Sequence, residues 1–548
     1  MGLKEAFLRS PLATYGRRIK AAPREVIFNR NLILSALLYA SSAIPTSLFA
    51  PRPLILSNTL LTFLFKAWDQ GSSATMASLP GFQRHFGISS GTDAQAIKNF
   101  VSIVYIGMAS GALLSFFVND RIGRRWSYRL YIAVWTLGQI VATLAPGLAG
   151  LYAARIITGL GMGGLTVTGP MSLVEIAPAE IRGLLASWFT VAMGFALVSA
   201  NFCVLGVFEH IPPGRLQFQV VFFSPCVFMW LCVGASFFFM CESPRWLMLV
   251  DRHDEGAKTL SRLRGLPADH PRVLREMSEI QTSMQLAREQ YGDDHHKGIV
   301  SILKETFTVP SNLRRVQQTL VSYGLAQLSG ANSVTSYFIP ILTLMGVGGG
   351  TTRNIFLSGM YAVSKLVFAI IASFFFIDAL GRRKSLFVGI LFQGISDIYL
   401  GVYIKYKQEG DASAASSRAA IGLIFIHAFG YAVGLFALPY VFGGELWPNR
   451  IRSFGGAMSQ CFHWLFIYAM TYGTPSLLQN TNNWGAFIFF AAWCGVSLGY
   501  VYLAVPELSG LSMEEIDTLF KGSWFNAYKK TKIRTVTIEG EENVEVLS

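Results

Sequence analysis

The sequence predicts an all-α membrane protein with twelve transmembrane helices in two six-helix bundles. Its 548 residues are 52% hydrophobic and only 14% charged, and their mean hydropathy is +0.43. A soluble core of ordinary size could not bury so many apolar side chains. The division into two bundles rests on a set of short cation-rich signatures that occurs twice, at matching places in the two halves of the chain. Such internal repeats are typical of duplicated membrane bundles.

Apolar runs long enough to cross a bilayer recur along the chain, since a helix needs about 20 residues to span a ~30 Å hydrocarbon layer. The first span begins near Asn31. The others are predicted near residues 97–117, 129–147, 151–174, 184–207, 218–240, 316–345, 354–377, 385–404, 419–442, 454–477 and 483–505. Six spans therefore precede a polar segment, and six follow it.

The polar segments divide the chain into five parts. In order, we expect a cytoplasmic N-terminal segment, a first bundle, a cytoplasmic loop of short amphipathic helices, a second bundle and a cytoplasmic tail, at 1–30, 31–246, 247–315, 316–507 and 508–548. Lys and Arg concentrate in alternate loops, and this positive-inside bias predicts that both termini are cytoplasmic. The bias accounts for the net charge of +13, so nucleic acid is not expected as a partner.

Each half carries the same pattern of charged loop residues. The first copy consists of Asp120, Arg121, Arg124 and Arg125 with Glu175 and Arg182, and the second consists of Asp378, Arg382 and Arg383 with Glu445 and Arg452. In both copies the glutamate precedes its arginine by seven residues. Arginines in loops this short lie at the headgroup level, close to the carboxylates, and helix N-termini attract acids such as Asp120 and Asp378.

These charges suggest a conformational latch. Pairs that bridge the two bundles on one face would hold that face closed and would stabilise an outward-facing state until solute binding offsets them. The alternative interpretation is that the charges set only the topology of the chain.

The ordered series of motifs resembles the sugar porter family of the major facilitator superfamily, in particular fungal monosaccharide transporters. Besides the paired signatures, the chain carries Arg155 in Arg-Ile-Ile-Thr-Gly, Glu-Ser-Pro-Arg-Trp-Leu at 242–247, Gln-Leu-Ser-Gly-Ala-Asn at 327–332 and Pro-Glu-Leu-Ser-Gly-Leu-Ser at 506–512. The resemblance runs over nearly the whole chain. It implies the major facilitator fold, a central solute site and alternating access.

A proton-coupling pair is expected in the first bundle. Ionisable groups inside a membrane are costly and are functional candidates by default, and Asp69 and Arg155 are the best pair. The resemblance places the proton-binding acid of the first span at Asp69, close to the arginine of span four. A change in their separation would bind and release a proton, because burial raises the pKa of an aspartate and a nearby arginine lowers it. The alternative is a static ion pair.

The solute site is expected on spans seven and ten. Gln327 and Asn332 are five residues apart, so a regular helix would place them about 140° apart at ~100° per residue. A kink at Gly330 could turn both side chains inward. The resemblance implies that Gln327 and Asn332 recognise hydroxyl groups, together with Tyr337 and Tyr440. For Tyr440, a packing role is an equal alternative.

Two departures from the family pattern bear on this site. Trp188, Ala326 and Ser336 stand where many sugar porters have polar or aromatic groups, so the site is expected to prefer another sugar, a polyol or a less hydroxylated ring acid. Residues 48–67 interrupt the first span with two prolines, which break a helix. We hypothesise that 48–67 is an insertion from a retained intron; a thirteenth hydrophobic segment or a re-entrant hairpin is the alternative.

The predicted function is import of a monosaccharide-like solute by alternating access and proton symport at the plasma membrane. The expected partners are a small sugar or polyol, a proton and membrane lipid, and the expected assembly is a monomer. A facilitative carrier of a polyol or a quinate-like ring acid remains an alternative, as does a non-transporting sugar sensor. No nucleophile, base and oxyanion set can be assembled from the loops, so neither an enzyme nor a cofactor is expected.

The remaining polar and sulfur residues are expected to be structural. His427 and His463 lie within apolar spans, where neutral, hydrogen-bonded core histidines are favoured. The six cysteines lack metal-type spacing and are expected to be free, packed thiols without a metal. The tail after Phe520 turns from basic to acidic and is expected to have no regular structure.

Overall fold

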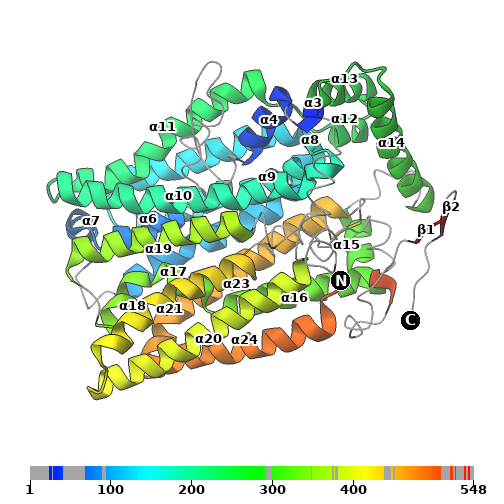
Figure 1. The fold of residues 1–548 in the computed structure, drawn as a ribbon. Helices are drawn as coiled ribbons and strands as arrows, with labels where there is room; N and C mark the ends of the chain where they lie inside the picture. Colours follow the sequence, from blue (N-terminus) through cyan, green and yellow to red (C-terminus); the bar gives the residue numbers. More distant parts are fainter. Residues whose placement is uncertain are drawn as a thin grey trace.

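A computed structural model shows long helices running side by side in two groups (Figure 1). The structure describes residues 24–27, 29–40, 68–88, 94–291, 299–346, 349–372, 376, 381–436, 446–448, 451–507, 519–522, 525, 536–538 and 541–543. The possible insertion at 48–67 therefore lies outside the described residues.

The first half of the chain forms the upper group of helices in Figure 1. Its elements are α3 (Arg24–Ile27), α4 (Arg30–Ala40), α6 (Trp68–Met76), α7 (Pro80–Phe86), α8 (Ala94–Leu144), α9 (Leu148–Ile176), the 3-10 turn η2 (Ala179–Ile181), α10 (Arg182–His210) and α11 (Arg215–Phe239). The second half forms α16 (Pro310–Leu328), α17 (Ala331–Ser336), α18 (Phe338–Leu344), α19 (Thr351–Ile371), α20 (Arg382–Glu409), α21 (Ala414–Val433), α23 (Arg452–Asn480) and α24 (Trp484–Ala504).

The number of crossings agrees with the predicted twelve. Among the described residues, eight helices are long and apolar enough to cross a membrane, namely α8, α9, α10, α11, α19, α20, α21 and α24. Helix α8 makes two crossings, because it merges two helices across a kink at Gly123. We assign the other three crossings to α4 with α6, to the series from α16 to α18, and to α23. The all-α, twelve-helix prediction is confirmed.

The polar segment between the halves is helical. It contains α12 (Pro244–Leu249), α13 (His253–Arg264), α14 (Pro271–Tyr291) and α15 (Ile299–Thr308), which gather at one end of the molecule (Figure 1). In the tail, β1 (Val536–Ile538) pairs antiparallel with β2 (Glu541–Asn543). The expectation of no regular structure after Phe520 is wrong at this hairpin, because Val-Thr-Ile favours an extended chain.

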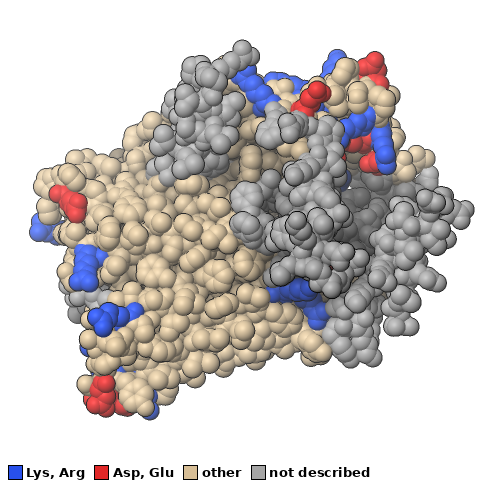
Figure 2. All heavy atoms as spheres, in the orientation of Figure 1, with Lys and Arg blue, Asp and Glu red and all other residues tan. Residues whose placement is uncertain are grey.

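The surface and the core have the polarity of a bilayer-spanning protein. In Figure 2, the described surface over the middle of the helices is almost free of charge, and described charged side chains gather at the two ends. Apolar side chains such as Leu137 and Ile398 are more than half exposed there. The largest buried apolar cluster joins side chains of α8, α9 and α10 to Trp464 and Ile467 of α23. The two halves therefore share one core along part of their interface.

Three glycines with positive φ lie at helix breaks or helix starts where the sequence places motifs. Gly123 and Gly381 have φ of 83° and 97°, and Gly330 has φ of 80°, a region that side chains with a Cβ rarely adopt. The signature expected as a loop at 118–128 is accordingly helical apart from Gly123. One glycine is enough to turn the chain there, so a longer loop is not needed.

Candidate functional site

A small cavity lies between the two halves near the middle of the helices. It is formed by α6 and α10 of the first half and by α19 and the end of α21 of the second half, with Gln70, Met193, Gly194, Leu197, Lys365, Tyr431, Ala432 and Phe436 lining it. Its volume is about 20 Å³, which is room for about one water molecule. A six-membered ring would need the helices to separate further.

A cluster of carboxamides adjoins this cavity. Helix α16 ends before Gly330 and α17 begins after it, so the helix breaks between Gln327 and Asn332. Asn332 Nδ2 donates to Gln327 Oε1 at 2.6 Å and lies 3.4 Å from the Tyr431 hydroxyl. From the other half, Gln70 Nε2 donates to Asn332 Oδ1 at 3.1 Å. The break at Gly330 thus brings both predicted amides to the interface between the halves.

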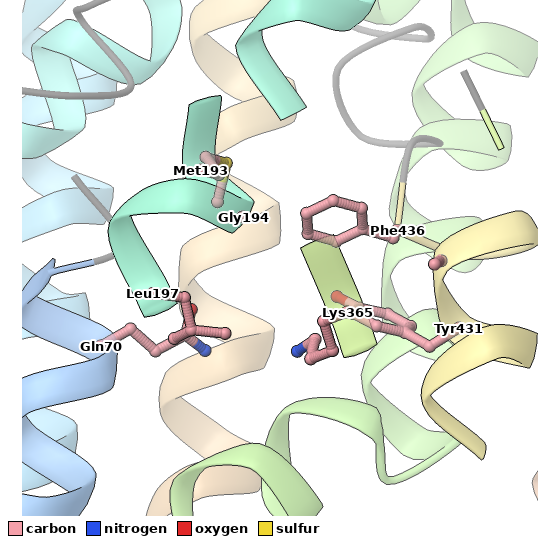
Figure 3. Close-up of a pocket in the computed structure, with 8 residues that line it drawn as sticks. Gln70, Met193, Gly194, Leu197, Lys365, Tyr431 and Phe436 are labelled. Carbon is pink, nitrogen blue, oxygen red and sulfur yellow. The ribbon is translucent and has the colours of Figure 1, made fainter. Parts of the chain in front are cut away.

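Lys365 is the cation of the cavity, and sequence reasoning did not identify it. It is 7% exposed, and its Nζ donates to Thr335 Oγ1 at 2.8 Å and lies 5.1 Å from the centroid of the Tyr431 ring. Among the described residues, no carboxylate forms an ion pair with it. Figure 3 shows Lys365 and Gln70 on opposite sides of the cavity, with their nitrogen atoms directed toward each other. Donors that face each other across a gap suit an acceptor placed between them.

Neither of the two predicted tyrosines is among the described residues that line the cavity. The Tyr337 hydroxyl donates to the Thr471 carbonyl of α23 at 2.9 Å, and Tyr337 is absent from the cavity lining. In this conformation the Tyr337 hydroxyl therefore bonds to α23. Tyr440 lies outside the described residues. Tyr431, which the sequence analysis did not single out, is the tyrosine that lines the cavity.

Asp69 and Arg155 form the buried ion pair that the sequence predicts. Arg155 Nη1 donates to Asp69 Oδ1. Asp69 is 4% exposed and Arg155 is 1% exposed. The guanidinium also donates to Ser73 Oγ at 2.8 Å and to the Phe100 carbonyl at 3.1 Å. Asp69 precedes Gln70, so the ion pair is one residue from the contact with Asn332.

The first charged signature is tied together within its own half. Arg124 donates to Glu175 through Nε and Nη2, both at 3.0 Å, and to Asp120 at 3.1 Å. The expectation that Asp120 caps the next helix is wrong, because the backbone amides of Arg124 and Arg125 donate to Glu242 at 2.9 and 3.2 Å. Burial raises the pKa of Glu242, and these amides oppose the rise.

The second signature repeats this arrangement. The amides of Arg382 and Arg383 donate to the two carboxylate oxygens of Glu507, both at 3.0 Å. A Cβ at Gly381 would lie 2.8 Å from Glu507, just as one at Gly123 would lie 2.7 Å from Glu242. The two halves therefore use one design, in which a carboxylate after the sixth span of each half caps the helix that follows the glycine.

The expected bridging of the two halves by these charges is not seen in the described pairs. Arg124 pairs with Glu175 and Asp120, all within the first half, and Arg121 is exposed. In the second half, Arg452 donates to the Trp447 carbonyl at 3.3 Å. Asp378 and Glu445 lie outside the described residues, as does the side chain of Arg182.

An aromatic contact bridges the halves beside the first signature. Phe116 of α8 and Phe454 of α23 have ring centroids 5.4 Å apart in an edge arrangement. Phe116 precedes Asp120 by about one helical turn and packs against apolar clusters of both halves. Phe116 thus places an apolar contact at this end of the interface between the halves.

Neither a metal centre nor a disulfide is found in the part of the chain that the structure describes. No group of three or more His, Cys, Asp or Glu side chains there could hold a metal ion. All six cysteines are free thiols, as predicted. The sequence analysis did miss Asp397, which lies within α20 and is 0% exposed. The signal for Asp397, as for Lys365, was an ionisable residue inside an apolar span.

Comparison with known proteins identifies the family. The family model described as "Sugar (and other) transporter" matches residues 55–520. The chain belongs to the sugar porter family of the major facilitator superfamily. This sugar porter is an integral membrane protein, and its relatives are transporters rather than enzymes.

Curated relatives of this sugar porter include quinate permeases. A quinate permease of Emericella nidulans is 27% identical over 461 residues, which cover 83% of this chain and 85% of the relative. A quinate permease of Neurospora terricola is 26% identical over 471 residues, with 83% and 86% covered.

Solved structures share the fold. The proton:xylose symporter XylE bound to 6-bromo-6-deoxy-D-glucose has a TM-score of 0.72 and 21% identity, and the match covers 90% of this chain and 100% of that one. The inward open conformation of the xylose transporter XylE from E. coli has a TM-score of 0.61 and 19% identity, with 90% and 99% covered.

Proposed function

We propose that this sugar porter is a secondary active transporter that imports a polyhydroxylated ring acid together with a proton. The observation that carries the proposal is Lys365, a buried cation at the cavity without an ion-pair partner among the described residues. A buried ammonium group is costly unless an anion pairs with it. A carboxylate on the solute would supply that anion and would be recognised by it.

The polar groups that line or adjoin the cavity suit the hydroxyl groups of such a solute. Gln70, Gln327 and Asn332 offer both donors and acceptors, and Tyr431 adds a ring wall and a hydroxyl. Such paired groups match a hydroxylated ring. The named substrate of the quinate permeases, a hydroxylated ring acid, supports the same solute class.

Proton coupling is assigned to Asp69 and Arg155. Their buried ion pair adjoins Gln70, which itself contacts Asn332 of the other half. Protonation of Asp69 would weaken its attraction to Arg155 and would change the position of the α6 backbone at the cavity. Solute and proton would thereby bind to coupled sites, as symport requires.

The charged signatures retain a proposed role as a latch, now with an apolar component. In each half a glutamate holds the turn of the signature, and Phe116 contacts Phe454 between the halves. We assign this end, with α12 to α15, to the cytoplasmic side, since its loops carry most of the Lys and Arg. The protein would work as a monomer, because each chain carries its own cavity. Its proposed location is the plasma membrane.

A neutral monosaccharide is the second candidate solute. The carboxamide cluster favours this candidate, because carboxamides both donate to and accept from hydroxyl groups. Lys365 is compatible with it, since a lysine can also donate to a hydroxyl oxygen. Uptake of labelled quinate, xylose, a hexose and a linear polyol into a transporter-null cell, with and without an uncoupler, separates the candidates. Uncoupler-sensitive quinate uptake is expected. Uptake of neutral sugars only would reject the ring acid, and no uptake by a folded, surface-exposed protein would favour the sensor.

A further inference from the structure

A second buried acid lies in the second half of the molecule, away from Asp69. Asp397 of α20 and His427 of α21 are both 0% exposed, and the carboxylate Oδ1 is 3.5 Å from the imidazole Nε2. Asp397 is about 22 Å along α20 from Arg382, at 1.5 Å per residue. The pair therefore lies deep within the apolar part of the bundle.

The carboxyl group of Asp397 has little else to interact with. Neither of its oxygens has a hydrogen-bond partner among the described residues. An isolated carboxylate in such a place would cost several kcal/mol, so the group pairs or becomes neutral instead. With one proton shared between them, Asp397 and His427 have no net charge in either arrangement of that proton.

Groups on the neighbouring helices determine where the proton lies. Lys365 of α19 acts electrostatically on His427. Tyr361 of α19 and Cys494 of α24 interact electrostatically with Asp397. The positive charge of Lys365 opposes an imidazolium ion. We therefore expect the proton on the Asp397 carboxyl and a neutral His427 ring beside it.

Polar contacts connect this pair to the solute site. Gln393 of α20 lies one helical turn before Asp397, and its Nε2 is 3.5 Å from His427 Nε2 and 3.4 Å from Ser329 Oγ. Ser329 directly precedes Gly330, at the break between Gln327 and Asn332. A change at the pair can thus reach the part of the chain that orients both amides.

We infer that Asp397 and His427 form a second proton-binding site, in the bundle opposite to the one that contains Asp69. When water reaches the pair, the proton leaves the Asp397 hydroxyl for water and leaves a carboxylate, and no other bond changes. An anion bound at Lys365 would offset the lysine charge and strengthen proton binding at the pair. This last step rests on the proposed function, whereas the proton site itself does not.

Infrared spectroscopy of the purified full-length protein without solute tests the site. The wild type is expected to show a protonated carboxylic acid band at neutral pH that Asp397→Asn lacks and that titrates as the pH rises. In His427→Gln the midpoint should move by about one pH unit or more. Asp397→Glu should keep a band, which provides a second readout if Asp397→Asn does not fold.

Asp69→Asn is the matched control, since it removes the buried acid that is ion-paired with Arg155 and should leave the Asp397 band in place. The inference is overturned if the band is the same in wild type and Asp397→Asn. It is also overturned if the band does not respond to pH, because the pair would then be a static hydrogen bond. Neither result depends on which solute the protein carries, so failure here is distinct from failure of the proposed function.

Discussion

Gln70 Nε2 donates a hydrogen bond to Asn332 Oδ1 at 3.1 Å and so joins the first span of one half to the seventh span of the other. Gln70 follows the proton-binding candidate Asp69, and Asn332 contacts both Gln327 and Tyr431. One contact thus connects the proton pair, the amide cluster and the cavity. This arrangement predicts that changes on either side of it affect solute affinity together.

A double-mutant cycle tests that coupling. Gln70→Met and Asn332→Leu should each weaken solute binding by about 0.5–1.5 kcal/mol, the usual net contribution of a hydrogen bond. The double variant should lose less than the sum of the two, because both changes remove the same contact. Binding titrations on purified protein measure the three losses, and simple additivity would show that the contact has no energetic role.

Asp69→Asn should separate accumulation from exchange. The amide has nearly the shape of the carboxyl group but cannot release a proton, so accumulation against a gradient should disappear while exchange of labelled for unlabelled solute continues. Uptake and exchange in vesicles with an imposed proton gradient measure both. Asp254→Asn, an exposed acid of α13, serves as the control. Unchanged accumulation in Asp69→Asn would remove this residue from the mechanism.

Gly123→Ala and Gly381→Ala should both destabilise the protein. Each glycine has positive φ with extended ψ, which costs a residue with a Cβ about 1–3 kcal/mol, and each new methyl group would lie within 3.0 Å of a capping glutamate. Thermal unfolding in detergent should show a lower midpoint for both. Gly206→Ala is the matched control, since nothing lies within 4 Å of a Cβ there. Equal midpoints in all three variants would contradict the capping role of Glu242 and Glu507.

Phe116→Gly should weaken the closed end of the interface. It removes a ring contact with Phe454 of the kind that contributes about 0.5–1.5 kcal/mol. Hydrogen exchange at the start of α23 should therefore become several-fold faster. Phe117→Gly has the same cost to the helix but leaves the Phe454 contact in place, so it is the matched control. Equal exchange in the two variants would show that the contact does not hold this end closed.

The sequence predicts this molecule well where one residue type has one physical role. The twelve spans follow from apolar length, and the cost of ionisable groups in lipid makes Asp69 and Arg155 candidates. The resemblance to sugar porters implied that the two lie close together. The break at Gly330 was predicted as a possibility, because only a kink could bring Gln327 and Asn332 together. Apart from the pairing of Asp69 with Arg155, these inferences need only local spacing and the cost of burial.

Other features depend on contacts between distant segments. Glu242 and Glu507 cap the signature helices, although Asp120 and Asp378 are nearer in sequence, because chain reversal brings the ends of the sixth spans beside Gly123 and Gly381. Likewise, Tyr431 rather than Tyr337 lines the cavity, since the break in span seven turns Tyr337 toward Thr471. The sequence alone could identify Lys365 and Asp397 as buried ionisable residues, but it could not identify the residues that they contact.

The most direct measurement compares binding of quinate and its neutral methyl ester to purified wild-type protein and to Lys365→Met. A charged hydrogen bond contributes about 1.5–3 kcal/mol, so wild type should prefer quinate by about tenfold or more. Lys365→Met should lose this preference, and Lys365→Arg should keep part of it. Equal binding of quinate and ester by wild type, or an unchanged preference in Lys365→Met, would contradict a solute carboxylate at Lys365.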